Sequence, residues 1–101
     1  MKPVIIHPEA EAEIETAADY LEASRARYGE KFRAEVATAL RQVGATPAVF
    51  SEFDGGPARR YLLNRFRYSV FFVELDDAVH VVSVAHQSRQ PGYWLDRLDD
   101  I

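Results

Sequence analysis

The 101 residues of the chain include no cysteine, which excludes disulfide bonds and thiolate chemistry. No apolar run approaches the ~20 residues that a membrane-spanning helix needs. The start of the chain has no basic segment followed by an apolar one, because acidic residues begin at Glu9. These absences predict a cytoplasmic protein that has no membrane partner.

Sequence motifs for metal ions and phosphate groups are also missing. Glycine-rich phosphate loops, nucleophile elbows, EF-hands and zinc-ligand spacings do not occur. The three histidines, His7, His80 and His86, lack the close spacing of a metal site. The sequence therefore predicts neither a metal nor a cofactor.

Acidic residues outnumber lysine and arginine by 16 to 12, and no lysine follows Lys31. The net charge at pH 7 is −4, whereas domains that bind nucleic acid through its phosphates are usually clearly basic. Residues 56–97 nevertheless hold six arginines against four acidic residues. The overall charge favours a protein target, and the local excess is compatible with an arginine-rich face.

The first part of the chain predicts a strand and then a helix. Residues 2–7 are mainly apolar, and Pro8 suits the first turn of a helix because that turn does not use its N–H. A helix over residues 8–24 is predicted from apolar residues that recur every three or four positions. These residues are Ala10, Ile14, Ala17 and Leu21.

A second helix is predicted over residues 30–43. Gly29 breaks the preceding pattern, Gly44 ends the helix and Pro47 prevents its continuation. The short connection between the helices predicts an antiparallel pair. The loop over residues 45–57 is expected to place three apolar side chains under the sheet: Val49, Phe50 and Phe53.

The second part of the chain predicts a three-strand antiparallel meander. Residues 58–63, 66–75 and 78–86 are rich in β-branched and aromatic residues, and short polar pairs separate them. The last strand is expected to place four even-numbered side chains on one face: His80, Val82, Val84 and His86.

This order predicts an α+β fold that forms a single domain over residues 1–101. A strand, an antiparallel helix hairpin and a three-strand antiparallel meander follow one another. The helices are expected on one face of the sheet, because each layer needs a cover for its apolar side. The other sheet face, with some of the arginines, is expected to be open to a partner.

Three stretches of the sequence carry a family resemblance: Arg59-Arg60, the aromatic strand over 66–72 and the strand end over 82–86. A terminal pattern is more distinctive, and it reads His86-x-x-Arg89-x-Pro91-x-Tyr93-Trp94-x-x-Arg97. In this order the stretches resemble the RelE/ParE superfamily of toxins from type II toxin–antitoxin systems. The terminal pattern is more similar to the ParE-like, plasmid stabilisation branch than to the RelE branch.

The resemblance implies a toxin that inhibits growth and forms a heteromeric complex with a cognate antitoxin. ParE-like members bind and poison DNA gyrase with no established catalysis of their own, whereas RelE-like members cleave messenger RNA on the ribosome. The terminal pattern and the acidic charge favour the gyrase poison. Two alternatives stay open: a ribosome-dependent mRNA endonuclease, and a family member without toxicity.

Cleavage of RNA through its 2′-hydroxyl needs a base, an acid and a cation beside the phosphate. If the chain is a ribonuclease, His86, Arg89 and Tyr93 are the candidate catalytic residues. His86 has a structural alternative, which is to orient the turn after the last strand.

Seven residues are candidates for binding the target: Arg59, Arg60, Arg67, Arg89, Tyr93, Trp94 and Arg97. The first two arginines point to opposite faces of a strand, and one of them can pair with a helix carboxylate such as Glu35. The tryptophan can close the core instead of contacting a partner. The last two arginines can pair with Asp96 or with the first helix.

Overall fold

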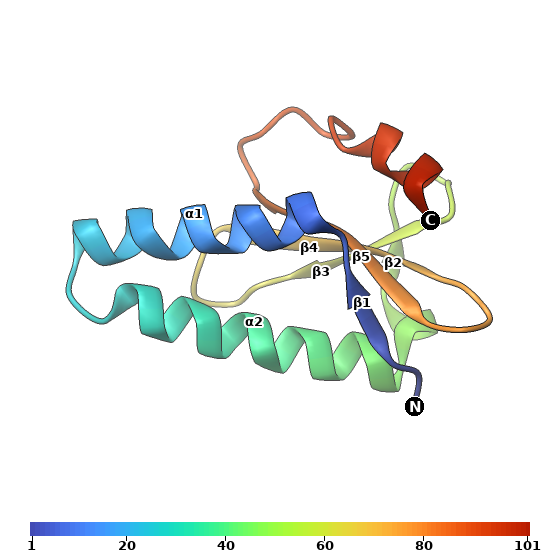
Figure 1. Ribbon diagram of the computed structural model, residues 1–101, viewed down its shortest axis with the longest axis horizontal. Coiled ribbons are helices and arrows are strands. Elements are labelled where there is room, and N and C mark those ends of the chain that lie inside the picture. Colours follow the sequence, from blue (N-terminus) through green and yellow to red (C-terminus); the bar gives the residue numbers. More distant parts are fainter.

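The computed structural model describes residues 1–101 and shows a five-stranded sheet with two helices on one face (Figure 1). The strands are β1 (Val4–Ile6), β2 (Ser51–Glu52), β3 (Ala58–Leu62), β4 (Tyr68–Glu74) and β5 (Val79–His86). The helices are α1 (Pro8–Ser24), α2 (Tyr28–Ala45) and the short 3₁₀ helices η1 (Pro47–Val49) and η2 (Leu95–Asp100). This arrangement confirms the predicted α+β fold.

The sheet is mixed, with the strand order β1-β5-β4-β3-β2. The predicted meander of β3, β4 and β5 is antiparallel, as expected. Strand β1 pairs in parallel with β5, where Ile5 stands opposite His80. The sequence does not predict β2, because Ser51 and Glu52 are both exposed and too few to show an alternating pattern.

Helix α1 spans the predicted residues, and the residue before it explains where it begins. The Nδ1 atom of His7 accepts a hydrogen bond of 3.1 Å from the backbone N–H of Glu9. That bond satisfies one of the free N–H groups of the first turn, and Pro8 needs none.

Helix α2 extends beyond its predicted limits, because Gly29 and Gly44 lie inside it. A Cβ atom at position 29 would stand 2.7 Å from the backbone oxygen of Ala18. One at position 44 would stand 3.0 Å from Cγ2 of Val4. The two glycines therefore allow α2 to approach α1 and β1 closely, and they do not end the helix.

The main core lies between the helices and the sheet. Phe32 of α2 is fully buried and meets the rings of Phe66 and Tyr68 edge-on, at centroid distances of 5.6 and 5.0 Å. Val70 and Phe72 of β4 belong to the same cluster. The even-numbered side chains of β4 therefore face the helices, in agreement with the alternation of a strand.

Strand β5 contains an irregularity that the sequence did not predict. Phe71 pairs with Ser83, but Phe72 pairs with Val81, so that Val82 is an additional residue on β5. Val84 packs under the helices, whereas Val82 belongs to the core on the opposite face. The expectation that the even-numbered residues of β5 share one face is wrong, because this bulge reverses the alternation.

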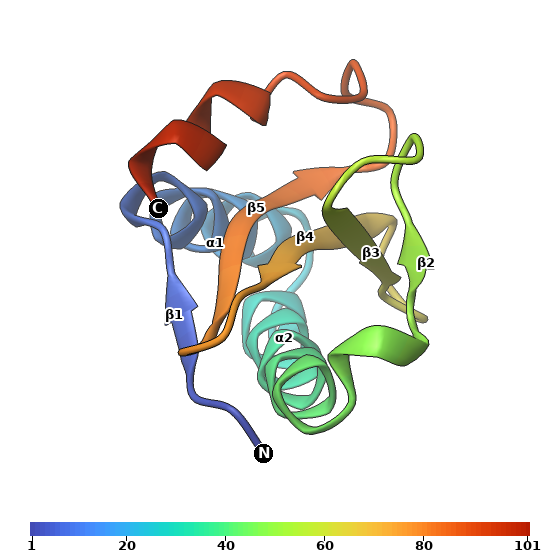
Figure 2. The same ribbon diagram turned by 90° about the vertical axis from the view of Figure 1, so that its right-hand side faces the viewer.

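The second sheet face is covered rather than open. The chain after β5 returns across this face and ends in η2 (Figure 2). Trp94 is fully buried there, with its ring 4.6 Å from that of Phe71 and 5.3 Å from that of Phe53. The prediction of a free sheet face is wrong, because Trp94 and its neighbours form a second core on it.

The loop before the meander is only partly buried. Phe50 packs against the main core and Phe53 against the second core, as expected. Val49 is 73% exposed, which contradicts its predicted place under the sheet.

None of the helices has both the length and the apolar character that a membrane crossing requires.

Candidate functional site

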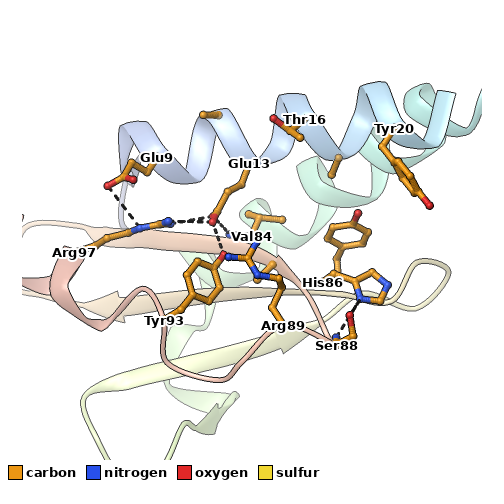
Figure 3. A pocket seen from close by; sticks show the side chains of 14 residues that line it. Glu9, Glu13, Thr16, Tyr20, Val84, His86, Ser88, Arg89, Tyr93 and Arg97 are labelled. Carbon is orange, nitrogen blue, oxygen red and sulfur yellow. Dashed lines mark hydrogen bonds and ion pairs between the residues drawn. The ribbon is translucent and has the colours of Figure 1, made fainter. Parts of the chain in front are cut away.

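A groove of about 670 Å³ lies between α1 and the end of β5, and the segment after β5 lines part of it (Figure 3). Helix α1 lines it with residues that include Ala12, Glu13, Thr16 and Tyr20. The facing residues include Tyr68, His86, Ser88, Arg89, Tyr93 and Arg97. The groove thus brings together the three catalytic candidates and Arg97, a target-binding candidate.

The carboxylate of Glu13 is the centre of the hydrogen bonding at one end of this groove. It accepts hydrogen bonds of 3.0 Å from the Ser83 hydroxyl and of 3.0 Å from the Val84 N–H. It also accepts a hydrogen bond from the Tyr93 hydroxyl, and bonds of 3.0 and 3.1 Å from Nη1 and Nη2 of Arg97. Both carboxylate oxygens are therefore occupied.

Arg97 is buried by the same contacts, with 8% of its surface exposed. Its Nη1 also donates to the carbonyl oxygen of Val82 at 2.9 Å, and its Nε lies 3.8 Å from Oε2 of Glu9. The predicted pairing of Arg97 with the first helix is confirmed. This arginine holds the chain after β5 against α1 and has little surface left for a partner.

The surroundings shift the pKa values of this cluster. Burial alone raises the pKa of Glu13, but the donors Arg97, Tyr93 and Val84 outweigh burial and hold that pKa below its usual value. Burial also lowers the pKa of Arg97, and the Glu13 carboxylate more than compensates, so that the pKa of Arg97 is raised. The pair is therefore charged on both sides at neutral pH.

Tyr93 is the aromatic member of the cluster. Burial, followed by its hydrogen bond to Glu13, raises the pKa of the Tyr93 hydroxyl. Its ring lies 4.1 Å from the guanidinium carbon of Arg89 and 5.4 Å from that of Arg97. Tyr93 therefore keeps its proton and directs it at Glu13, and Arg89 covers its ring at the surface.

His86 lies beyond Arg89 and is fixed by Ser88. Its Nδ1 accepts the backbone N–H of Ser88 at 3.1 Å and lies 2.7 Å from the Ser88 hydroxyl oxygen. A neutral His86 therefore carries its proton on Nε2, because Nδ1 must offer a lone pair. Its ring meets Tyr68 edge-on at 5.1 Å. The predicted turn-orienting contact is thus present.

The strand arginines divide between the two sheet faces, as their alternation predicts. Arg59 stands opposite Phe72, and its Nη1 donates to the carbonyl oxygen of Phe50 at 2.6 Å. Arg60 stands opposite Phe71 on the face that Trp94 covers. Neither arginine lines the groove, and neither does the exposed Arg67.

The predicted ion pair of Arg59 or Arg60 with Glu35 is wrong. The carboxylate of Glu35 instead accepts the backbone N–H groups of Asn64 and Arg65, the latter at 3.1 Å. It therefore caps the turn between β3 and β4, and Arg59 pairs with Glu52 at 3.8 Å.

Glu13 is the residue that the sequence prediction missed. Acidic residues in the first turns of a helix favour its positive end, which explains Glu13 without a partner. Its position, however, lies three residues after Ala10 and four before Ala17, both on the buried face. A carboxylate on the apolar side of a helix requires a donor, and this spacing was the available signal.

The groove offers donors more than it offers a base. The exposed Arg89 and the Nε2–H of His86 are free to bind acceptors, while the carboxylate in its wall is already paired. No group of three or more histidine, cysteine, aspartate or glutamate side chains is placed to hold a metal ion. The arrangement suits the binding of hydrogen-bond acceptors.

Comparisons with known proteins agree with this fold. Residues 4–91 match the family model described as ParE toxin of type II toxin–antitoxin system, parDE. Among solved structures, the chain resembles one from the chromosomal ParDE toxin–antitoxin system of P. aeruginosa, with a TM-score of 0.64 and 16% identity over 85% of this chain and 96% of that one. A search of curated protein sequences gives no match. The family model covers most of the sequence, and the chain therefore belongs to the ParE toxin family of type II toxin–antitoxin systems.

Proposed function

We propose that this chain is a toxin that inhibits growth by binding and poisoning DNA gyrase, and that a cognate antitoxin neutralises it in a heteromeric complex. The observation that carries the proposal is the state of the groups around the groove. Two of the three candidates for RNA cleavage, His86 and Tyr93, are engaged in structural contacts, while the exposed side chains of Arg89 and Tyr20 remain for a protein partner.

Ribonuclease chemistry requires a group that can take the proton of the 2′-hydroxyl. His86 supports such a role poorly, because its Nδ1 lone pair accepts the Ser88 N–H and its Nε2 carries the proton. The Tyr93 hydroxyl already donates a hydrogen bond to Glu13, and the same carboxylate balances the positive charge of Arg97. Only Arg89 of the three catalytic candidates is free of a polar partner within the chain.

A protein target is supported by the surface that remains. Tyr20 is 67% exposed at one wall of the groove, and Arg89 is exposed at the other. Tyrosine and arginine are enriched among the residues that dominate protein–protein binding. The net charge of −4 disfavours a phosphate-rich target and is compatible with a protein.

Neutralisation by an antitoxin is supported by family membership and by the size of the groove. Type II antitoxins are proteins, and a groove of about 670 Å³ has room for several side chains of a polypeptide. Binding there would cover Arg89 and Tyr20, so that antitoxin and target would compete for the same surface.

The test begins with induction of the chain alone in cells and pulse-labelling of DNA and protein synthesis. A gyrase poison is expected to reduce DNA synthesis first and to produce broken chromosomes. The purified protein is also expected to inhibit DNA supercoiling by gyrase. An early fall in protein synthesis with cleaved messages would instead identify a ribonuclease, and no effect on either would identify a member without toxicity.

A matched pair of variants links the effect to the groove. Arg89→Ala removes the exposed guanidinium beside Tyr93 and is expected to reduce growth inhibition at least about tenfold, the effect of one charged contact at an interface. Arg41→Ala removes another exposed arginine, from α2 and outside the groove lining, and is expected to retain inhibition. Equal growth inhibition by both variants would show that Arg89 in the groove is not required for toxicity.

A further inference from the structure

A second, smaller cavity of about 50 Å³ adjoins the groove. The two share four lining residues: Ala85, His86, Arg89 and Tyr93. The rest of its wall comes from strands β3 and β4 and from the segment after β5. Its further polar lining consists of Arg60, Ser69, Gln87 and Gln90, and of Trp94, whose indole carries an N–H.

The charge of this cavity is one-sided. Arg60 and Arg89 line it, and no aspartate or glutamate does. Neither arginine forms an ion pair within the chain, in contrast to Arg33, Arg59 and Arg97, each of which binds a carboxylate. In a chain with a net charge of −4, this is a local positive site without its counter-charge.

Trp94 forms part of the lining of the same cavity. Its Nε1 is the only buried side-chain nitrogen or oxygen in the chain that has no hydrogen-bond partner. Buried donors are nearly always paired in folded proteins, so this indole is an unusual element of the cavity lining and a close reporter of what binds beside it. An acceptor with negative charge would serve the two guanidinium groups together.

We propose that this cavity binds the carboxylate of an aspartate or glutamate side chain from a protein partner, whose backbone lies in the adjoining groove. Guanidinium groups bind carboxylates through two parallel hydrogen bonds, and a cavity of about 50 Å³ has space for such a group. The acidic net charge opposes the approach of a nucleic acid, which would bring many phosphates. The inference rests on the proposed action through protein partners, and it adds the chemistry by which they are recognised.

The single tryptophan makes the cavity directly observable, because the chain gives one indole N–H signal in a ¹H–¹⁵N NMR spectrum. The probe is the capped tripeptide acetyl-Gly-Glu-Gly-amide, and its counterpart with glutamine in the centre is the control. The glutamate peptide is expected to shift the Trp94 signal saturably, and the glutamine peptide to bind at least about tenfold more weakly. A Trp94 signal that does not move with the glutamate peptide overturns the proposal.

Variants locate the binding. Arg60→Gln and Arg89→Gln are each expected to weaken the glutamate peptide at least about tenfold, whereas Arg41→Gln on α2 is expected to bind as the unchanged chain does. An unchanged amide spectrum elsewhere shows that each variant is folded. Equal weakening by all three would reveal a general charge effect and would overturn the cavity as the site.

Two further titrations separate this site from other anions and from the proposed target. The carboxylate assignment would be overturned if inorganic phosphate moves the Trp94 signal and the glutamate peptide does not. Tight binding of a short RNA at the same residues would overturn it as well. The peptide titration is independent of toxicity. Binding without gyrase inhibition therefore contradicts only the target, and gyrase inhibition without binding contradicts only the cavity.

Discussion

Two glutamates of α1 each bind an arginine with both carboxylate oxygens, but in different surroundings. Glu15 and Arg33 have side chains that are 57% and 43% exposed. Glu13 and Arg97 have side chains that are 18% and 10% exposed. Water screens the first pair, whereas loss of one partner from the second leaves a buried charge uncompensated. Only the second pair is expected to matter for folding.

Replacement of Glu13 by alanine is therefore expected to lower the free energy of unfolding by about 3 kcal/mol, because Arg97 stays charged and loses its partner. Urea denaturation, followed by the fluorescence of the buried Trp94, measures this change. Glu15→Ala is the control on the same helix and is expected to alter stability little. Equal losses in the two variants would contradict the distinction between the pairs.

The Glu13 carboxylate also makes the free energy of unfolding depend on pH. The folded chain holds the pKa of Glu13 below its ordinary value of 4.5, whereas the unfolded chain does not. Its contribution is therefore complete above that ordinary value and is lost as the pH falls through the lower, folded pKa. As the pH falls below 4.5, the unfolding free energy should therefore decrease less steeply in Glu13→Gln than in the unchanged chain. Parallel curves would show that this carboxylate does not cause the loss.

At the scale of elements, the packing of α2 against α1 depends on a residue without a side chain. Gly29→Ala is expected to lower the free energy of unfolding by about 2 kcal/mol, because its Cβ would meet the backbone oxygen of Ala18 at 2.7 Å. Gly56→Ala provides the control, since the nearest atom to its Cβ lies at 3.6 Å. Thermal unfolding measures the stability of both variants. A Gly29→Ala variant that is more stable than the unchanged chain would show that α1 and α2 can move apart without loss of stability.

The elements that the sequence predicted are those with a strong local pattern. Helix α1 has periodic apolar residues, and strands β3 to β5 lie in segments rich in β-branched and aromatic residues, so their existence and approximate limits followed from local chemistry. Gly29 and Gly44 were read as helix limits, because a glycine that permits close approach looks the same in the sequence as one that ends a helix. The bulge at Val82 was missed for a similar reason, since an apolar residue suits either face of a buried strand.

The candidate site was predicted in part. The terminal pattern correctly placed His86, Arg89, Tyr93 and Arg97 near one another, because they follow the same strand within a short distance. Their partner Glu13 lies 84 residues from Arg97, and a local pattern cannot identify a contact of that separation. The burial of Trp94 in the core was one of the two roles foreseen for it, but the cover of the second sheet face depends on the same long-range return of the chain and was missed.

At the scale of the whole molecule, acidic and basic side chains are distributed unequally. The net charge is −4, yet the cavity beside the groove is lined by two arginines without acidic partners. Long-range attraction would therefore be weak for a polyanion, whereas a partner with one well-placed carboxylate can bind locally. A protein of this kind selects its partner by short-range fit more than by overall charge.

The parallel pairing of the first strand with the last has a consequence for synthesis on the ribosome. Strand β1 and Glu13 are translated before β5 and Arg97, with which they pair. At about 5–20 residues per second, α1 waits roughly 4–17 s for Arg97 to be translated. The groove therefore cannot form until Arg97 has been translated, because the Glu13 cluster at one end of the groove requires this residue.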